Sequence, residues 1–125
     1  MTGITFDTGG LIALDRDDRR VIALLARAAE IGARVTIPAT ALAQAIRSPS
    51  RQARLSRLVR QPSTTLAALD GPDATRVGIL LAASRTADIT DAHVVVCARR
   101  SGQAIVTSDP DDIGRLDSRA RLIVV

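Results

Sequence analysis

Two short hydrophobic segments of this chain each end in an aspartate. Residues Gly3–Phe6 run into Asp7, and residues Gln103–Thr107 run into Ser108 and Asp109. In open α/β sheets, ligands bind outside the carboxyl ends of the strands. If the two segments are neighbouring parallel strands, carboxylates from opposite ends of the chain meet at one edge of the sheet.

Two further aspartates, Asp88 and Asp91, stand three residues apart, just before a long apolar run. On a helix this spacing puts both carboxylates on one face. Clustered carboxylates repel one another unless a proton or a cation lies between them. Together with Asp7 and Asp109, this pair predicts a site for a hard divalent metal ion.

Each of these aspartates also has a structural interpretation. A side-chain oxygen at the start of a helix can accept hydrogen bonds from free backbone N–H groups. Asp7 and Asp88 both precede candidate helices, and Asp109 precedes Pro110, a residue typical of a first helical turn. None of these signals is specific singly. Their shared location is what favours the metal site.

The apolar run after Asp91 contains the single histidine, His93, and the single cysteine, Cys97. Histidine commonly serves as a base or a zinc ligand. Neither a partnering cysteine nor a second histidine is evident for His93, so we expect a packed or surface side chain rather than a zinc site. A lone cysteine excludes a disulfide framework and fits a reduced cytoplasmic setting, and we expect Cys97 to be a buried thiol.

The composition narrows the classes of function. The chain has 125 residues, which fits a single domain over 1–125, and its aromatic share is only 1%, with Phe6 the sole member. Stacking of bases on aromatic side chains is therefore excluded as a way to bind nucleic acid. No apolar run is long enough to span a membrane, and no signal peptide is evident.

The formal net charge is +4, and every basic residue is an arginine. Guanidinium groups bind phosphate in a bidentate way, which lysine cannot do. The densest basic feature is a series at every third or fourth position: Arg47, Arg51, Arg54, Arg57 and Arg60. On one helix these residues would cover a broad stripe, which is either a solvated face or a polyanion-binding face.

Strand and helix patterns alternate along the chain, which predicts an α/β fold with a mostly parallel sheet and helices on both faces. Asp17 is expected to cap the first long helix, and Gly32 to end it. The expected strands are 3–6, 34–37, 64–69, 103–107 and 122–125. The expected helices are 17–31, 38–47, 51–60, 73–84, 89–100 and 111–116.

The sequence resembles the PIN-domain family, and specifically VapC-type toxins of bacterial type II toxin–antitoxin pairs, over essentially its whole length. The resemblance rests on residues 5–14, 37–44, 88–93 and 105–109. It implies a small three-layer α/β/α domain whose central, mostly parallel sheet has four to five strands.

The resemblance also implies a site. Asp7, Asp91 and Asp109 occupy the acidic positions that hold Mg²⁺ or Mn²⁺. The family often has a glutamate where this chain has Gln44, and Asp88 is the candidate replacement for that lost carboxylate among the catalytic acids. The residues expected beside the metal are Thr8, Gln44, Ser108 and Asp112, and those expected on the RNA backbone are Arg47, Arg51 and Arg54.

The function implied by the resemblance is that of a Mg²⁺-dependent endoribonuclease toxin that cleaves structured RNA of the tRNA or rRNA class. A cognate antitoxin and a homodimer are the implied protein partners. Two alternatives stay open. One is a binding module for nucleic acid or protein that has lost catalysis, which the presence of Gln44 favours. The other is a housekeeping RNA-processing nuclease.

Overall fold

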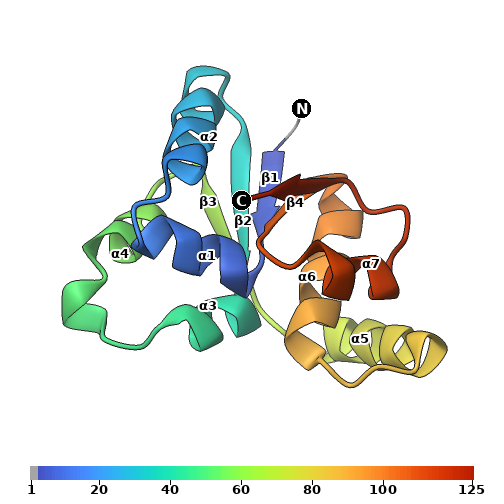
Figure 1. The fold of residues 1–125 in the computed structure, drawn as a ribbon. Coiled ribbons are helices and arrows are strands. Elements are labelled where there is room, and N and C mark those ends of the chain that lie inside the picture. Colours follow the sequence, from blue (N-terminus) through green and yellow to red (C-terminus); the bar gives the residue numbers. More distant parts are fainter. Residues whose placement is uncertain (1–2) are drawn as a thin grey trace.

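Five parallel strands form one sheet in the order β3-β2-β1-β4-β5 (Figure 1). The computed structural model describes residues 3–125. The strands are β1 (Gly3–Phe6), β2 (Arg34–Pro38), β3 (Thr64–Ala67), β4 (Ala104–Thr107) and β5 (Leu122–Val124). The first strand lies at the centre, where Thr5 is in register with Thr36 on one side and Ile105 on the other. The predicted pairing of the first strand with the strand before Asp109 is thus confirmed.

Helices cover both faces of this sheet. They are α1 (Thr8–Asp15), α2 (Arg19–Glu30), α3 (Ala39–Ala45), the 3₁₀ helix η1 (Pro49–Arg51), α4 (Ala53–Val59), α5 (Gly71–Ser84), α6 (Ile89–Ser101) and α7 (Pro110–Leu116). In Figure 1, α1, α2 and α4 lie to the left of the sheet, and α5, α6 and α7 lie to its right. The predicted three-layer α/β architecture is confirmed. Within residues 3–125, no helix is both long and apolar enough to cross a membrane.

The core is almost entirely aliphatic, with Phe6 as its largest buried side chain. The run Val94–Val96 favours a strand by local propensity, but it lies in α6, whose residues from Ala92 to Ala98 are all buried. A helix that is apolar on all sides is stable when other elements cover it completely. The predicted helix at this position is confirmed, and its burial brings Asp91 to the end of the sheet.

The segment between the first two strands differs from the prediction, because it contains two helices rather than one. The pair Gly9-Gly10 is typical of a turn, but it opens α1, which Asp7 caps. The predicted cap Asp17 was wrong: its φ is 64°, in the left-handed region, and Asp18 accepts the N–H groups of the first turn of α2 instead. Gly32, with a φ of 67°, follows the end of α2 as predicted.

The arginine series does not form one helical stripe. The helical conformation is interrupted at Ser48 and Pro49. Arg51 therefore lies in η1, while Arg54 and Arg57 lie in α4. The helices before and after this break are accordingly shorter than predicted. The other elements begin and end within a few residues of their predicted bounds.

Candidate functional site

The end of β1 places Asp7 inside the molecule rather than on its surface. Asp7 is only 3% exposed, and its Oδ1 accepts the N–H of Gly10 at 2.7 Å. Burial raises the pKa of this carboxyl, while hydrogen bonds from Thr107 and the first turn of α1 act in the opposite direction. The capping interpretation is therefore confirmed, and the same residue is a fixed, buried carboxylate at a strand end.

Two glycines allow the start of α1 to lie directly on the end of β4. A Cβ at Gly10 would stand 2.6 Å from the carbonyl oxygen of Val106 and 3.0 Å from Phe6 Cδ1. A Cβ at Gly9 would collide with Ser108 Oγ. The absence of side chains at these positions brings Asp7 beside the residues that follow β4.

Asp109 follows β4 at the N-cap position of α7, yet its side chain makes no capping hydrogen bond. Its backbone N–H donates to Thr107 Oγ1 at 2.8 Å. The capping interpretation was therefore wrong for this residue. The Asp109 carboxyl instead faces Asp112, whose pKa is raised first by a hydrogen bond with Asp109 and then by its charge.

The start of α6 contributes the remaining two carboxylates. Asp88 is exposed and caps the helix, its Oδ1 accepting the N–H of Asp91 at 2.8 Å. Burial first, and then the negative charges of Asp88, Asp7, Asp112 and Asp109 in that order, raise the pKa of Asp91 to about 6. Asp7, Asp88, Asp109 and Asp112 thus all act on the charge of Asp91, and we call these five residues the acid cluster.

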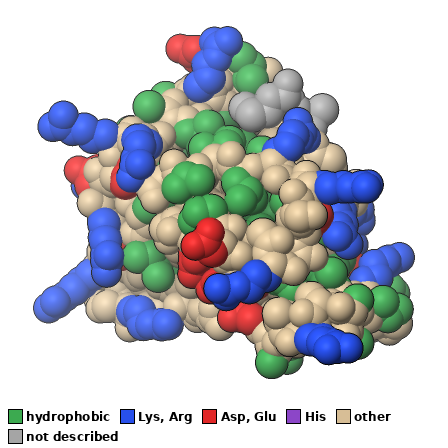
Figure 2. All heavy atoms as spheres, turned by 45° about the vertical axis from the view of Figure 1, so that its right-hand side comes forward, with side chains coloured by type: hydrophobic (Ala, Val, Ile, Leu, Met, Phe, Trp, Pro, Cys, Tyr) green, Lys and Arg blue, Asp and Glu red, His purple; other side chains and the backbone are tan. Residues whose placement is uncertain are grey.

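The acid cluster offers the type of ligand that a hard divalent cation prefers, although within residues 3–125 no three of its carboxylates have ligand atoms within 4.8 Å of one another. Mg²⁺ and Ca²⁺ prefer carboxylate and water oxygens, which are the only ligands this set offers. Burial is the main cause of the raised pKa of Asp91, and the negative charges of the four neighbouring aspartates add to it. Among the five, and within residues 3–125, only Asp112 has an arginine partner, Arg115 at 2.8 Å, and that pair is exposed. Acidic side chains stand together near the middle of the face in Figure 2, with arginines projecting around them.

Gln44 and Thr8 lie at the rim of this site. Thr8 Oγ1 donates to Gln44 Oε1 at 3.1 Å, which links α3 to the residue that follows Asp7. Gln44 is exposed and brings no charge, so the acid cluster contains no carboxylate from α3. Ser108 is exposed, and its side chain lies next to Gly9.

The three arginines expected on RNA lie apart from these carboxylates. Arg54 pairs with Asp17 at 3.2 Å, and Arg47 donates to the carbonyl of Ile46 at 3.0 Å. Arg51 is exposed in η1. Across residues 3–125, the structure shows no bond between these three side chains and the acid cluster.

A second polar group is buried behind α6, and the sequence did not reveal it. Ligand atoms of Asp73, His93 and Cys97 all lie within 4.8 Å of one another. The expectation that no cysteine accompanies His93 was wrong, since Cys97 is one helical turn further on the same face; the i, i+4 spacing was the available signal. Cys97 is buried as expected, and burial raises the pKa of its thiol to about 11.

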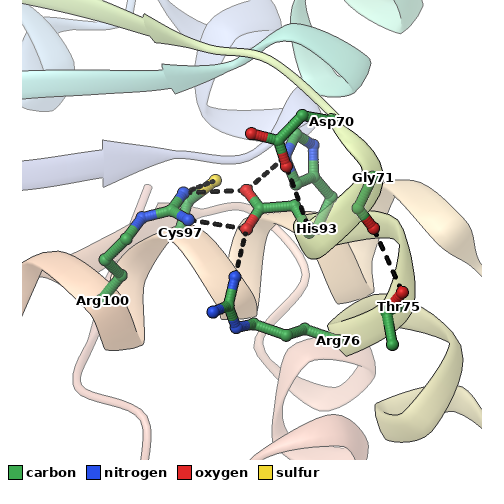
Figure 3. A network of polar contacts seen from close by, with 8 residues as sticks. Asp70, Gly71, Thr75, Arg76, His93, Cys97 and Arg100 are labelled. Carbon is green, nitrogen blue, oxygen red and sulfur yellow. Dashed lines mark hydrogen bonds and ion pairs between the residues drawn. The ribbon is translucent and has the colours of Figure 1, made fainter.

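This second group differs from the acid cluster in its charge balance. Arg100 donates to both oxygens of Asp73, at 2.6 and 2.9 Å, and Arg76 donates to one of them at 3.1 Å (Figure 3). These bonds hold the pKa of Asp73 below its usual value. Because guanidinium groups already neutralise this carboxylate, the acid cluster is the better candidate for a divalent cation.

Two comparisons with known proteins bear on the family and the fold of the chain. The PIN domain family matches residues 4–118. A solved structure, that of VapBC2 from Rickettsia felis bound to a DNA fragment from their promoter, contains a chain of the same fold, with a TM-score of 0.68, 13% identity and 98% of each chain covered. No curated protein sequence gives a match.

Proposed function

The chain belongs to the PIN-domain family, and from this premise we propose that it is a divalent-metal-dependent endoribonuclease, the toxin of a toxin–antitoxin pair. The observation that carries the proposal is the acid cluster. Five carboxylates from β1, β4, α6 and α7 gather at one edge of the sheet, and their repulsion contributes to a pKa of about 6 for Asp91. Carboxylates in this state attract a cation.

Asp7, Asp91 and Asp109 would hold Mg²⁺ or Mn²⁺. A metal bound there would supply an activated water and neutralise charge on the scissile phosphodiester. Asp7 is suited to this role because Gly10 and Thr107 fix its carboxylate. Asp88 is exposed, and the N–H of Asp91 occupies only one of its oxygens, which leaves the other free to orient the attacking water.

The charge of the chain supports RNA as the substrate. A net charge of +4 attracts a polyanion, while the acid cluster alone would repel one. Because Phe6 is buried in the core, the protein would grip the backbone rather than stack bases. Exposed arginines such as Arg47 and Arg51 are the proposed contacts, and structured RNA of the tRNA or rRNA class is the proposed target.

The proposed protein partners are a cognate antitoxin and a second copy of this chain. The solved structure of similar fold is a VapBC2 assembly, which motivates the first. Exposed apolar side chains motivate the second, with Ile79 at 66% and Ile89 at 54% exposure.

A binding module without catalysis is the second candidate, and Gln44 is the observation that favours it. Its amide oxygen is engaged with Thr8, so α3 adds neither charge nor a free ligand to the site. Such a protein would bind RNA without cleaving it.

Cleavage of purified tRNA and rRNA fragments separates these candidates. We expect the wild-type protein to cleave in Mg²⁺ or Mn²⁺ and to be inactive in EDTA. Asp91→Asn should lose about 100-fold or more of the cleavage rate, as expected when a group that stabilises the transition state is lost. Asp111→Asn, an exposed neighbour outside the acid cluster, is the matched control. Full activity in Asp91→Asn would contradict the proposed site, and RNA binding by a wild type that does not cleave would establish the module.

A further inference from the structure

A chain of three polar side chains, two of them buried, joins α3, α5 and α6. His93 of α6 is fully buried, with its Nδ1 2.7 Å from Thr40 Oγ1 of α3. Its Nε2 lies 3.7 Å from Oδ2 of Asp73, a residue of α5 that is 1% exposed. Figure 3 shows this region from close by. We call Thr40, His93 and Asp73 the polar chain.

The α5 end of the polar chain is fixed independently of His93. Both oxygens of Asp73 accept bonds from Arg100, one of them also from Arg76, and the backbone N–H of Asp73 donates to Asp70 Oδ1 at 2.9 Å. Charge-assisted, bidentate bonds of this kind are the strong and geometrically specific ones. These bonds therefore hold the Asp73 carboxylate in a fixed position next to His93.

His93 lies between Thr40 and Asp73 in this arrangement. A Thr40 hydroxyl that donates to Nδ1 leaves the Nε2–H directed at the Asp73 carboxylate, although at 3.7 Å it makes no hydrogen bond. The one side-chain hydrogen bond that the His93 ring makes in the described structure is thus the one with Thr40.

This bond connects two helices that carry residues of the candidate site. His93 is two residues from Asp91, in the first turns of α6. Thr40 stands one turn before Gln44 on α3, and Gln44 bonds Thr8, the neighbour of Asp7. The contact between Thr40 and His93 thus ties α3 and α6 together at the point where each approaches the site.

We propose that His93 is a positioning residue of the acid cluster: held between Thr40 and the anchored Asp73, it fixes the first turn of α6, and with it the Asp91 carboxylate, relative to α3 and α5. This inference rests on the proposed function, which supplies the metal. The contacts among Thr40, His93 and Asp73 are present without a metal. A displacement of about 1 Å in a catalytic group costs on the order of 100-fold in rate, so a fixed helix start has functional value.

Two substitutions at Thr40 test the proposal. Thr40→Val keeps the shape of the side chain and removes the hydroxyl, whereas Thr40→Ser keeps the hydroxyl. We expect Thr40→Val to weaken Mn²⁺ binding by about tenfold, in the range seen when outer partners of metal ligands are lost, and Thr40→Ser to stay within about twofold of wild type. Equal binding by Thr40→Val and wild type, or equal weakening in both variants, would overturn the proposal.

Amide hydrogen exchange provides a second readout that needs neither metal nor RNA. We expect Thr40→Val to exchange faster at the N–H groups of Asp91 and Ala92 but not in β1. Val95→Ala, a cavity in the same helix away from the polar chain, should instead accelerate exchange along α6 as a whole. Unchanged protection at Asp91 in Thr40→Val would overturn the inference. Absent Mn²⁺ binding by the wild type would count against the proposed function only, since the exchange result decides the positioning role.

Discussion

Asp7 and Asp91, which follow the first strand and open the sixth helix, lie close enough for the charge of Asp7 to raise the pKa of Asp91. The pairing of β1 with β4 and the burial of α6 against β1 produce this proximity. Residues far apart in the chain therefore share one electrostatic site.

Asp91→Asn should stabilise the metal-free protein. The native Asp91 keeps its proton up to a pH of about 6, whereas in the unfolded chain it releases the proton near 3.8, the ordinary pKa of an aspartate. The native state therefore binds more protons between these values, and the free energy of unfolding falls as pH rises through this window. We expect a gain of about 1–2 kcal/mol at pH 7.5, below the full value of the pKa shift because Asp91 is only half-buried. Urea unfolding in EDTA measures it.

The pH profile gives this prediction its control. The stabilising effect of Asp91→Asn should disappear near pH 4, where the native Asp91 is already protonated. Asp111→Asn should leave the profile unchanged. A destabilised Asp91→Asn protein at pH 7.5 would show that the cluster is not under electrostatic strain.

Mn²⁺ binding should weaken as pH falls below 6. A metal must displace the proton that Asp91 holds, because carboxylate ligands bind in the deprotonated form. We expect the apparent affinity to drop by about tenfold per pH unit for the one proton displaced. Titrations at pH 5.0, 6.0 and 7.5 check this expectation, and an affinity independent of pH would exclude Asp91 as a ligand.

Gly10→Ala should destabilise the fold, contrary to the usual effect of alanine in a helix. The added Cβ would stand 2.6 Å from a backbone carbonyl in β4, which cannot move away easily. We expect a loss of about 1–3 kcal/mol, the usual cost of overpacking. Gly78→Ala is the matched control, because a Cβ there meets nothing within 4 Å; it should stabilise the protein by about 0.5–1 kcal/mol. Thermal melts measure the stability of both variants. Equal changes in the two would contradict the close approach of Gly10 to β4.

Arg100→Met should lower the free energy of unfolding far more than the substitution of an arginine in an exposed ion pair does. In the described residues it leaves the buried Asp73 with Arg76 as its one remaining guanidinium, and loss of hydrogen bonds to a charged group costs about 1.5–3 kcal/mol. Arg27→Ala removes an exposed pair with Glu30 and should cost well under about 1 kcal/mol. Denaturant unfolding of the two variants measures the difference, and a small effect of Arg100→Met would mean that Asp73 finds water.

The strands and the acidic positions were predictable because both depend on local patterns. Short β-branched runs identified β1 and β4, and parallel pairing then required Asp7 and Asp109 to share an edge. Helix α1 was not among the expected helices because its two adjacent glycines resemble a turn, and the packing of Gly9 against Ser108 explains one of them.

The polar chain could not be predicted, since it depends on how α3, α5 and α6 meet in space. Asp73 reads as an ordinary first-turn acid, and Thr40 as an ordinary helical residue. Their connection through His93 exists only after three separate helices have packed together.

Calorimetric titration of Mn²⁺ into the wild-type protein, Asp7→Asn and Asp91→Asn tests the central claim most directly. We expect saturable binding by the wild type, and an affinity that is about tenfold or more weaker in each variant while both remain folded. Binding that is absent from the wild type, or that persists unchanged in Asp91→Asn, would contradict the assignment of the acid cluster as a metal site.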